Sequence, residues 1–257
     1  MLYPYVTMIL SGIIHDDIDL YSMLLYYNSL CNIVICIYKH QYDILDKTIV
    51  RIDNKNIRII TIDINELTDM LHVKQIPKYT KTDECHNCYY QLMSTKIGLD
   101  IISTEYVIKC RIDHHYSNLH KMIDMCIQNN KIVSSSICVR GTSIHRWRFH
   151  LSETLYIGKT SEIKIVNKLA LDNYTIEEIT YRPPECRSWR HYFIKLIPDD
   201  VSNEEYASSM ADLVDIINVN EFKPFYLRLN NYHKTFTHID DNIKSTYLYL
   251  LDGCTGI

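Results

Sequence analysis

Two apolar runs separated by one helical pattern, all within the first 37 residues, constrain the fold more than any other feature of this chain. Residues 5–10 and 32–37 are continuous apolar runs of strand length, and residues 16–28 between them carry apolar side chains at helical spacing. A helix between two strands is the pattern of a βαβ unit, in which the strands are parallel and the crossover is right-handed. The sequence therefore predicts an α/β fold with a mostly parallel sheet.

Composition excludes several classes of protein. The chain has 257 residues, enough for one α/β domain with a sizeable core, and its net charge of −4 provides no basic field for nucleic acid. No run approaches the ~18 apolar residues that a membrane span needs. The apolar start lacks a basic region, so we expect a first strand there and not a signal peptide.

Cysteine usage indicates the redox compartment of the protein, and tyrosine usage indicates the base composition of its coding genome. Nine cysteines without a repeating framework are typical of buried thiols in a reducing compartment, so we expect a cytoplasmic protein. The 21 tyrosines, with many Ile, Asn, Lys and Asp, favour an AT-rich coding genome. A large DNA virus fits this bias, as does an AT-rich microbe; a viral protein would act in the host cytoplasm.

Residues 87–115 combine a helix, a turn and a buried strand that ends in charged side chains. Alternation along the strand places Lys109 and Arg111 on one side, together with Asp113 if the chain stays extended. Ligands of α/β proteins bind at the carboxyl ends of strands. Asp113 and His115 form an Asp-x-His step, which can chelate a divalent cation that in turn holds a diphosphate. The alternative interpretation is a surface salt-bridge cluster.

The pattern Asn87…Gln91…Ser94-Thr95…Gly98-Leu99…Thr104-x-Tyr106…Lys109-x-Arg111-x-Asp113 resembles the core of the WavE lipopolysaccharide-synthesis family. Members are regarded as glycosyltransferases of the GT-A type that use a nucleotide-sugar donor. The resemblance implies a single GT-A-like domain over residues 1–257, a Rossmann-like, mostly parallel sheet flanked by helices. Residues 1–140 would form the nucleotide-sugar-binding half, and residues 141–257 the acceptor-side half with C-terminal helices.

The resemblance also implies roles for individual residues. Asp113, with His115, would bind Mn²⁺ or Mg²⁺, which offsets charge on the departing diphosphate. Ser11 and Gly12 would contact the nucleotide through backbone N–H groups, although a plain strand-to-helix turn is the alternative. The expected donor-binding residues are Ser11, Gly12, Gln91, Lys109, Arg111 and Asp113.

Two carboxylates are candidates for the catalytic base, because an inverting transfer requires deprotonation of the acceptor hydroxyl. Glu153 lies in Ser152-Glu153-Thr154, where Ser-Asp-Trp is common in the family. This departure at two positions puts the acceptor site in doubt. Glu185 follows Pro184 in a Pro-Glu step that the family shares, but an acid in the first turn after proline is also ordinary helix-start chemistry.

The predicted function is therefore a metal-dependent, hexosyltransferase-like glycosyltransferase of polysaccharide biosynthesis. It would move a sugar from a nucleotide-sugar donor, with a UDP-sugar as first choice, to a glycan or glycoprotein acceptor. One alternative is a catalytically inactive module that binds a sugar-nucleotide or a glycan. A second is a nucleotidyltransferase, which usually has a glycine-rich phosphate loop near the N-terminus, and residues 11–15 are not one.

Overall fold

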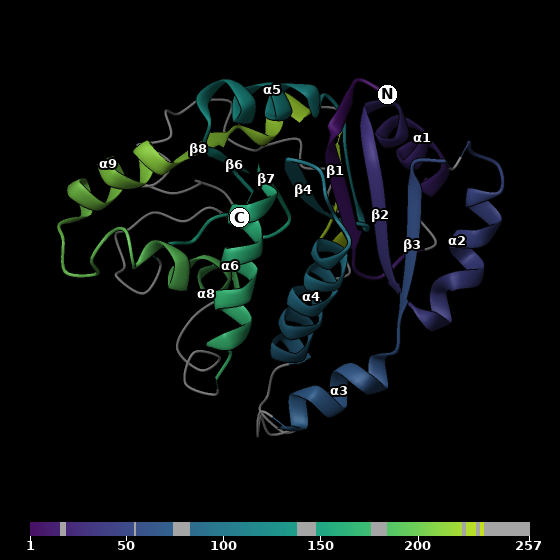
Figure 1. The fold of residues 1–257 in the computed structure, drawn as a ribbon, viewed down its shortest axis with the longest axis horizontal. Coiled ribbons are helices and arrows are strands. Elements are labelled where there is room, and N and C mark those ends of the chain that lie inside the picture. Colours follow the sequence, from purple (N-terminus) through teal and green to yellow (C-terminus); the bar gives the residue numbers. More distant parts are fainter. Residues whose placement is uncertain are drawn as a thin grey trace.

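The computed structural model describes residues 1–15, 19–53, 55–73, 83–137, 148–175, 184–222, 225–229 and 232–233. Its centre is a seven-stranded sheet in the order β3-β2-β1-β4-β7-β6-β8 (Figure 1). The strands of this sheet are Tyr3–Ser11 (β1), Cys31–Tyr38 (β2), Ile57–Ile62 (β3), Tyr106–Arg111 (β4), Ile132–Ser135 (β6), Leu155–Lys159 (β7) and Val214–Ile217 (β8). Strand β7 runs antiparallel to β4 and β6, and the other neighbouring pairs are parallel.

Helices cover both faces of the sheet. Helices α1 (Leu20–Leu30) and α5 (His120–Asn129) lie on one face, where the Tyr26 hydroxyl accepts a 3.0 Å hydrogen bond from the Leu119 backbone N–H at the start of α5. Helices α4 (Asp83–Asp100) and α6 (Thr160–Asp172) lie side by side on the other face. The expected α/β class, a Rossmann-like and mostly parallel sheet flanked by helices, is confirmed.

The remaining elements border this core. Helix α8 (Pro184–Phe193) packs against α6. The other helices are α2 (Tyr42–Ile49), α3 (Ile64–Val73) and α9 (Asn203–Leu213), with short 3₁₀ turns η1 (Lys39–Gln41) and η3 (Val219–Phe222). A second, three-stranded sheet pairs β5 (His114–Tyr116) with β9 (Phe225–Leu229) and β9 with β10 (Tyr232–His233). The expected helical C-terminal part is therefore present, but it also contributes strands.

Gly98 of the 87–113 pattern lets α4 pack closely against the sheet, and two hydroxyl residues of the pattern bond within the helix. A Cβ atom on Gly98 would lie 3.1 Å from the Ile9 side chain and 3.2 Å from the Cys36 sulfur, so only glycine lets the helix approach β1 and β2 this closely. The Ser94 and Thr95 hydroxyls donate to carbonyls one turn earlier in the same helix. Much of the dense pattern therefore has a packing role.

Two segments differ from the secondary structure that their composition predicts. Residues 64–86, which look polar and irregular in sequence, contain α3 and the start of α4, while residues 74–82 lie outside the described part. Helix α3 forms because Leu67 is buried and the Asp63 carboxylate accepts a hydrogen bond from the Asn65 backbone N–H. The apolar spacing of residues 203–217 favours one helix, but helix α9 ends at Leu213, because the β-branched residues Val214, Ile216 and Ile217 pair with β6 as part of strand β8.

Candidate functional site

The sheet has a topological switch point between β1 and β4. From β1 the chain continues to β2 and β3 on one side, and then crosses to β4 on the other side of β1. Ligands of open α/β sheets bind in the crevice outside the carboxyl ends of such strands. Ser11 and Arg111, the last residues of β1 and β4, are direct partners in the register of the two strands. The structure therefore brings two of the predicted donor-binding residues together.

Ser11 and Gly12 shape the β1 side of this switch point. The Ser11 side chain is fully buried, and its hydroxyl has no hydrogen-bond partner. Its carbonyl accepts a 3.0 Å hydrogen bond from the Ile112 backbone N–H, which ties the end of β1 to the end of β4. Gly12 has a φ of +124°, a conformation that other residues rarely adopt. The strand-to-helix turn therefore requires glycine at this position.

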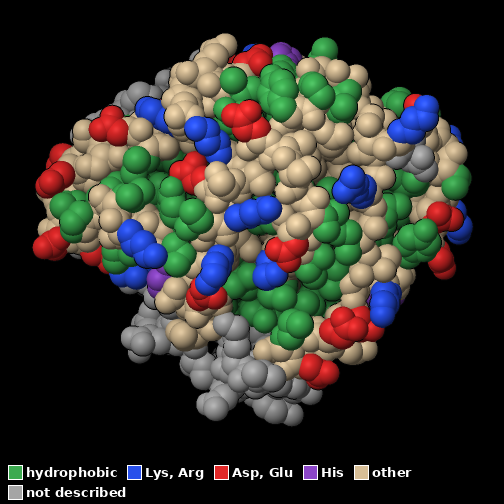
Figure 2. Space-filling view, viewed as in Figure 1, with side chains coloured by type: hydrophobic (Ala, Val, Ile, Leu, Met, Phe, Trp, Pro, Cys, Tyr) green, Lys and Arg blue, Asp and Glu red, His purple; other side chains and the backbone are tan. Residues whose placement is uncertain are grey.

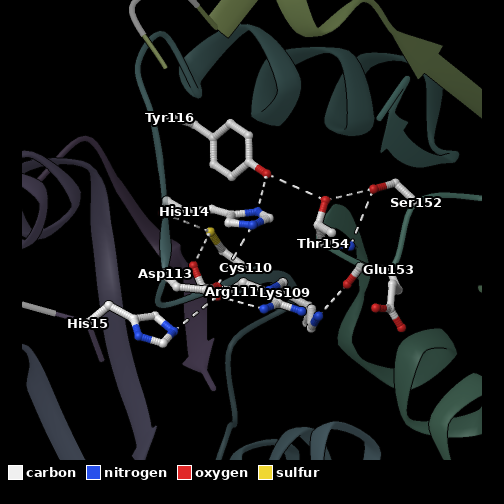
Figure 3. Close-up of polar contacts among 10 residues, drawn as sticks. All are labelled: His15, Lys109, Cys110, Arg111, Asp113, His114, Tyr116, Ser152, Glu153 and Thr154. Atoms are coloured by element: carbon white, nitrogen blue, oxygen red, sulfur yellow. Dashed lines mark hydrogen bonds and ion pairs between the residues drawn. The ribbon is translucent and has the colours of Figure 1, made fainter. Parts of the chain in front are cut away.

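Arg111 and Asp113 form a two-point ion pair on the β4 side. The guanidinium donates from Nε to one carboxylate oxygen at 2.8 Å and from Nη2 to the other at 2.6 Å (Figure 3). The Asp113 side chain is 2% exposed and the Arg111 side chain 25% exposed. Burial acts to raise the pKa of Asp113, but the hydrogen bonds and charge of Arg111 outweigh it, and the net pKa is lowered. Asp113 is therefore an ionised, buried carboxylate.

Two histidines other than the predicted one flank the Asp113 carboxylate. His15 Nε2 lies 4.0 Å from Oδ2, and His114 Nε2 lies 3.9 Å from Oδ1. His115 instead packs edge-on against the Tyr27 ring, with ring centroids 5.9 Å apart. Burial lowers the pKa of His115, which keeps its imidazole neutral at pH 7. The structure does not bring His115 to the carboxylate with which it was expected to chelate an ion.

The described residues do not fit a divalent metal ion in this arrangement. Within the part of the chain that the structure describes, no group of three or more His, Cys, Asp or Glu side chains is close enough to hold a metal. Both Asp113 oxygens accept hydrogen bonds from Arg111, and the guanidinium charge beside them opposes a second cation. An ion at this position would first have to separate the pair.

Lys109 is buried against the segment that carries Glu153. Its ammonium group donates to the Glu153 backbone carbonyl, and its residue exposure is 3%. Burial lowers the pKa of Lys109, and the nearby negative charge of Glu153 offsets part of this effect. The predicted phosphate-binding lysine thus lies beneath the surface, whereas the guanidinium of Arg111 is partly open to solvent.

Gln91 lines a small cavity together with Lys109 and Glu153. Gln91, Lys109 and Glu153 line a cavity of about 20 Å³ together with residues of α4, β7 and α8, including Ser188. The Gln91 Oε1 atom is buried without a hydrogen-bond partner. A volume of this size holds about one water molecule. The cavity therefore joins three predicted site residues, but it is too small for a sugar unless α8 or the Glu153 segment moves.

A buried polar network that the sequence does not reveal holds Glu153 in place. The Ser152 and Thr154 hydroxyls lie 2.9 Å apart, and Thr154 accepts a 3.4 Å hydrogen bond from the Tyr116 hydroxyl. Tyr116 in turn contacts His114 Nδ1 at 3.0 Å. The network links the two sides of the site through residues that flank Glu153 and Asp113 (Figure 3). Thr154 belongs to this network through both of these contacts.

Glu185 lies in the first turn of α8, and its side chain is outside the described part of the structure. Its role therefore stays a prediction. Ser188, one turn later in the same helix, lines the cavity with Glu153.

Comparisons with known proteins describe the fold. No family model matches the chain, and no curated protein sequence matches it. Similar solved structures include the galactosyltransferase LgtC in complex with donor and acceptor sugar analogs, at 10% identity and a TM-score of 0.49 over 71% of this chain and 68% of that chain. The apo form of mouse xyloside xylosyltransferase 1 is 10% identical, with a TM-score of 0.42 over 83% of this chain and 84% of that chain.

A synthase is similar to the same degree. The 4-diphosphocytidyl-2C-methyl-D-erythritol synthase from Anaerococcus prevotii DSM 20548 is 11% identical, with a TM-score of 0.46 over 84% of this chain and 87% of that chain. These proteins differ in the activities that their names state.

Proposed function

We propose that this chain is a GT-A-like glycosyltransferase that moves a sugar from a nucleotide-sugar donor, with a UDP-sugar as first choice, to a glycan or glycoprotein acceptor. The observation that carries the proposal is the switch point, where Ser11, Gly12 and Arg111 meet at the carboxyl ends of β1 and β4. An arginine there suits a diphosphate, because its planar guanidinium can donate two parallel hydrogen bonds.

The proposed reaction assigns separate tasks to the two sides of the site. The acceptor oxygen attacks the anomeric carbon of the donor sugar, and the bond to the diphosphate oxygen breaks. In an inverting transfer, Glu153 or Glu185 would take the proton of the acceptor hydroxyl. Arg111 would bind the leaving diphosphate after releasing Asp113, and Lys109 would support the Glu153 segment from beneath.

A catalytically inactive module that binds a sugar-nucleotide is the second candidate. Two observations favour it: the Arg111 guanidinium is already occupied by Asp113, and the described residues form no metal site. Such a module would use the same switch point for binding, without a base in reach of an acceptor. The two candidates therefore differ in turnover and not in the place where the nucleotide binds.

A screen of nucleotide-sugars separates the candidates. Release of nucleoside diphosphate is measured with Mn²⁺, with Mg²⁺ and with a chelator, beside binding of the same donors. An enzyme would release diphosphate, and the Glu153→Gln or Glu185→Gln change at the true base would slow release by roughly 10²–10⁴-fold with donor affinity kept. Binding without release supports the inactive module, and no binding of any donor contradicts both.

Finer assignments belong to the same proposal. Membership of the WavE family rests on the residue pattern of 87–113, and a viral source rests on composition alone. Metal dependence stays a prediction, which the chelator arm of the screen tests. A reducing, cytoplasmic setting is supported by Cys31, Cys36, Cys110 and Cys126, which are buried thiols outside any disulfide. Burial raises the pKa of each of these thiols to about 12. None of the helices that the structure describes has the length and apolar character of a membrane span.

A further inference from the structure

Two adjoining cavities form a groove at the end of the sheet opposite the switch point. One cavity, of 410 Å³, lies between the start of β4 and the start of α6, and the other, of 350 Å³, lies at the starts of β2 and β3. Residues 102–104 line both cavities, so the two adjoin along this segment and are called the groove below. Strand β4 separates this groove from Arg111 by about 17 Å, at 3.3 Å per residue.

The groove is basic although the whole chain is acidic. Its charged lining residues are Lys55, Arg58, Lys159, Lys164 and Glu105, which is four positive charges against one negative, or +3. The net charge of the chain is −4. Lys and Arg side chains gather across the middle of the face on which α4 and α6 lie (Figure 2). A local excess of positive charge on an acidic protein points to a specific anionic ligand.

The start of α6 adds anion-binding groups to one end of the groove. The first N–H groups of a helix have no partner within the helix and carry a partial positive charge. In α6 the Thr160 N–H already donates a 2.8 Å hydrogen bond to the Glu105 carbonyl, so an anion would meet the N–H groups of the residues that follow. Lys159, the residue before α6, makes no capping hydrogen bond with its side chain. Thr160 lines the cavity, is 7% exposed, and has a hydroxyl without a hydrogen-bond partner. A helix start flanked by Lys159 and Lys164 is therefore a suitable place for a phosphate group.

The rest of the lining indicates which anions fit. Among the sixteen described residues that line the two cavities, seven have hydroxyl or amide side chains, including Ser103, Thr104, Ser161 and Asn56, and none is aromatic. Recognition of a nucleobase usually relies on an aromatic surface for stacking. The described lining can therefore bind charged oxygens, and none of its residues provides a platform for a base.

We propose that this groove is a second binding site, for a phosphate-bearing ligand that has no stacked base. One phosphate group binds at the start of α6 between Lys159 and Lys164, and a second anionic group binds near Lys55 and Arg58. The site is separate from the switch point and does not depend on the proposed transferase activity.

Calorimetric titration of the full chain with tripolyphosphate and with orthophosphate tests the proposal. We compare wild type with two double variants, Lys159→Gln with Lys164→Gln, and Lys55→Gln with Arg58→Gln. The control is Lys168→Gln, whose exposed side chain on α6 pairs with an acid one turn later and lies outside the groove lining. We expect each double variant to weaken tripolyphosphate binding about tenfold, because each loses two charge-assisted hydrogen bonds. Orthophosphate should weaken only in the first variant, and the control should match wild type.

Two further measurements keep the outcome decisive. Lys164 also donates a 3.2 Å hydrogen bond to the Ile102 carbonyl, so melting temperatures show whether the first variant is folded; the second pair makes no such side-chain bond in the described structure. The titration is repeated with Arg111→Lys, since the switch point is an alternative place for tripolyphosphate. Wild-type affinity in both double variants, or a loss confined to the Arg111 variant, would overturn the groove site. If Lys168→Gln weakened tripolyphosphate binding as much as the double variants do, the binding would be nonspecific electrostatic attraction. That result would also overturn the groove site.

Discussion

An Asp113→Asn variant keeps the shape of the side chain and removes the charge to which Arg111 is bonded. If the pair were exposed, the loss would be at most ~1 kcal/mol. In the structure the carboxylate is 2% exposed, and removing one partner of a buried pair costs about 3–5 kcal/mol. Arg111 is 25% exposed and can regain water, so we expect the lower end, about 3 kcal/mol. For a chain of this size that corresponds to a drop in Tm of roughly 6–12 °C.

The stability difference between wild type and Asp113→Asn should depend on pH. The pKa of Asp113 is lowered in the folded protein, because Arg111 outweighs the effect of burial. A carboxylate with a lowered folded pKa stabilises the protein above its unfolded pKa, about 3.9, and this contribution is lost as the pH falls through the folded value. The difference in unfolding free energy between wild type and variant should therefore be complete at pH 7 and shrink below about pH 4.

Chemical denaturation at several pH values, beside donor titration with and without Mn²⁺, provides the assay. Asp100→Asn is the matched control, because Asp100 is 57% exposed and pairs with Lys96 on the surface of α4. The control should lose no more than ~1 kcal/mol. An Asp113→Asn protein that is as stable as this control, yet no longer binds donor in the presence of Mn²⁺, would refute the buried ion pair and support a metal ligand.

Two other substitutions test the packing around the site. Gly98→Ala places a Cβ 3.1 Å from Ile9 and 3.2 Å from Cys36, so α4 must shift. We expect the unfolding free energy, measured by urea denaturation, to fall by about 1–3 kcal/mol. An unchanged urea midpoint would contradict the close approach of α4 to the sheet. Lys109→Met keeps a linear side chain but removes a buried ammonium whose pKa is lowered mainly by burial. Because the pKa of Lys109 is lowered by folding, wild type gains stability as the pH rises towards the unfolded pKa of 10.5. The unfolding free energy of the Met variant, relative to wild type, should therefore be higher at pH 7 than at pH 10.5. A difference that does not change with pH would show that Lys109 is not desolvated.

Local sequence patterns were sufficient for the main architecture. Runs of strand length separated by a helical period predict the parallel β1-α1-β2 unit, and the structure confirms it. Local spacing does not predict the secondary structure where apolar side chains are few, or where their spacing fits both a helix and a strand. Composition does not predict helix α3, because Leu67, its buried anchor, stands among polar neighbours. Periodicity does not predict strand β8, because its residues also fit a helical period.

The sequence by itself determined which residues share one side of β4, because alternation along a strand is a local property. That was enough to place Lys109, Arg111 and Asp113 together and to leave both a ligand site and a salt bridge open. Only the tertiary structure decided their partners: Arg111 bonds Asp113, and Lys109 donates to the carbonyl of Glu153, 44 residues away. Spacing along a strand sets the direction in which a side chain points. Desolvation and long-range packing decide which partner compensates the charge of a buried side chain. For that reason the antiparallel insertion of β7, which brings Glu153 to Lys109, could not be deduced from the order of residues.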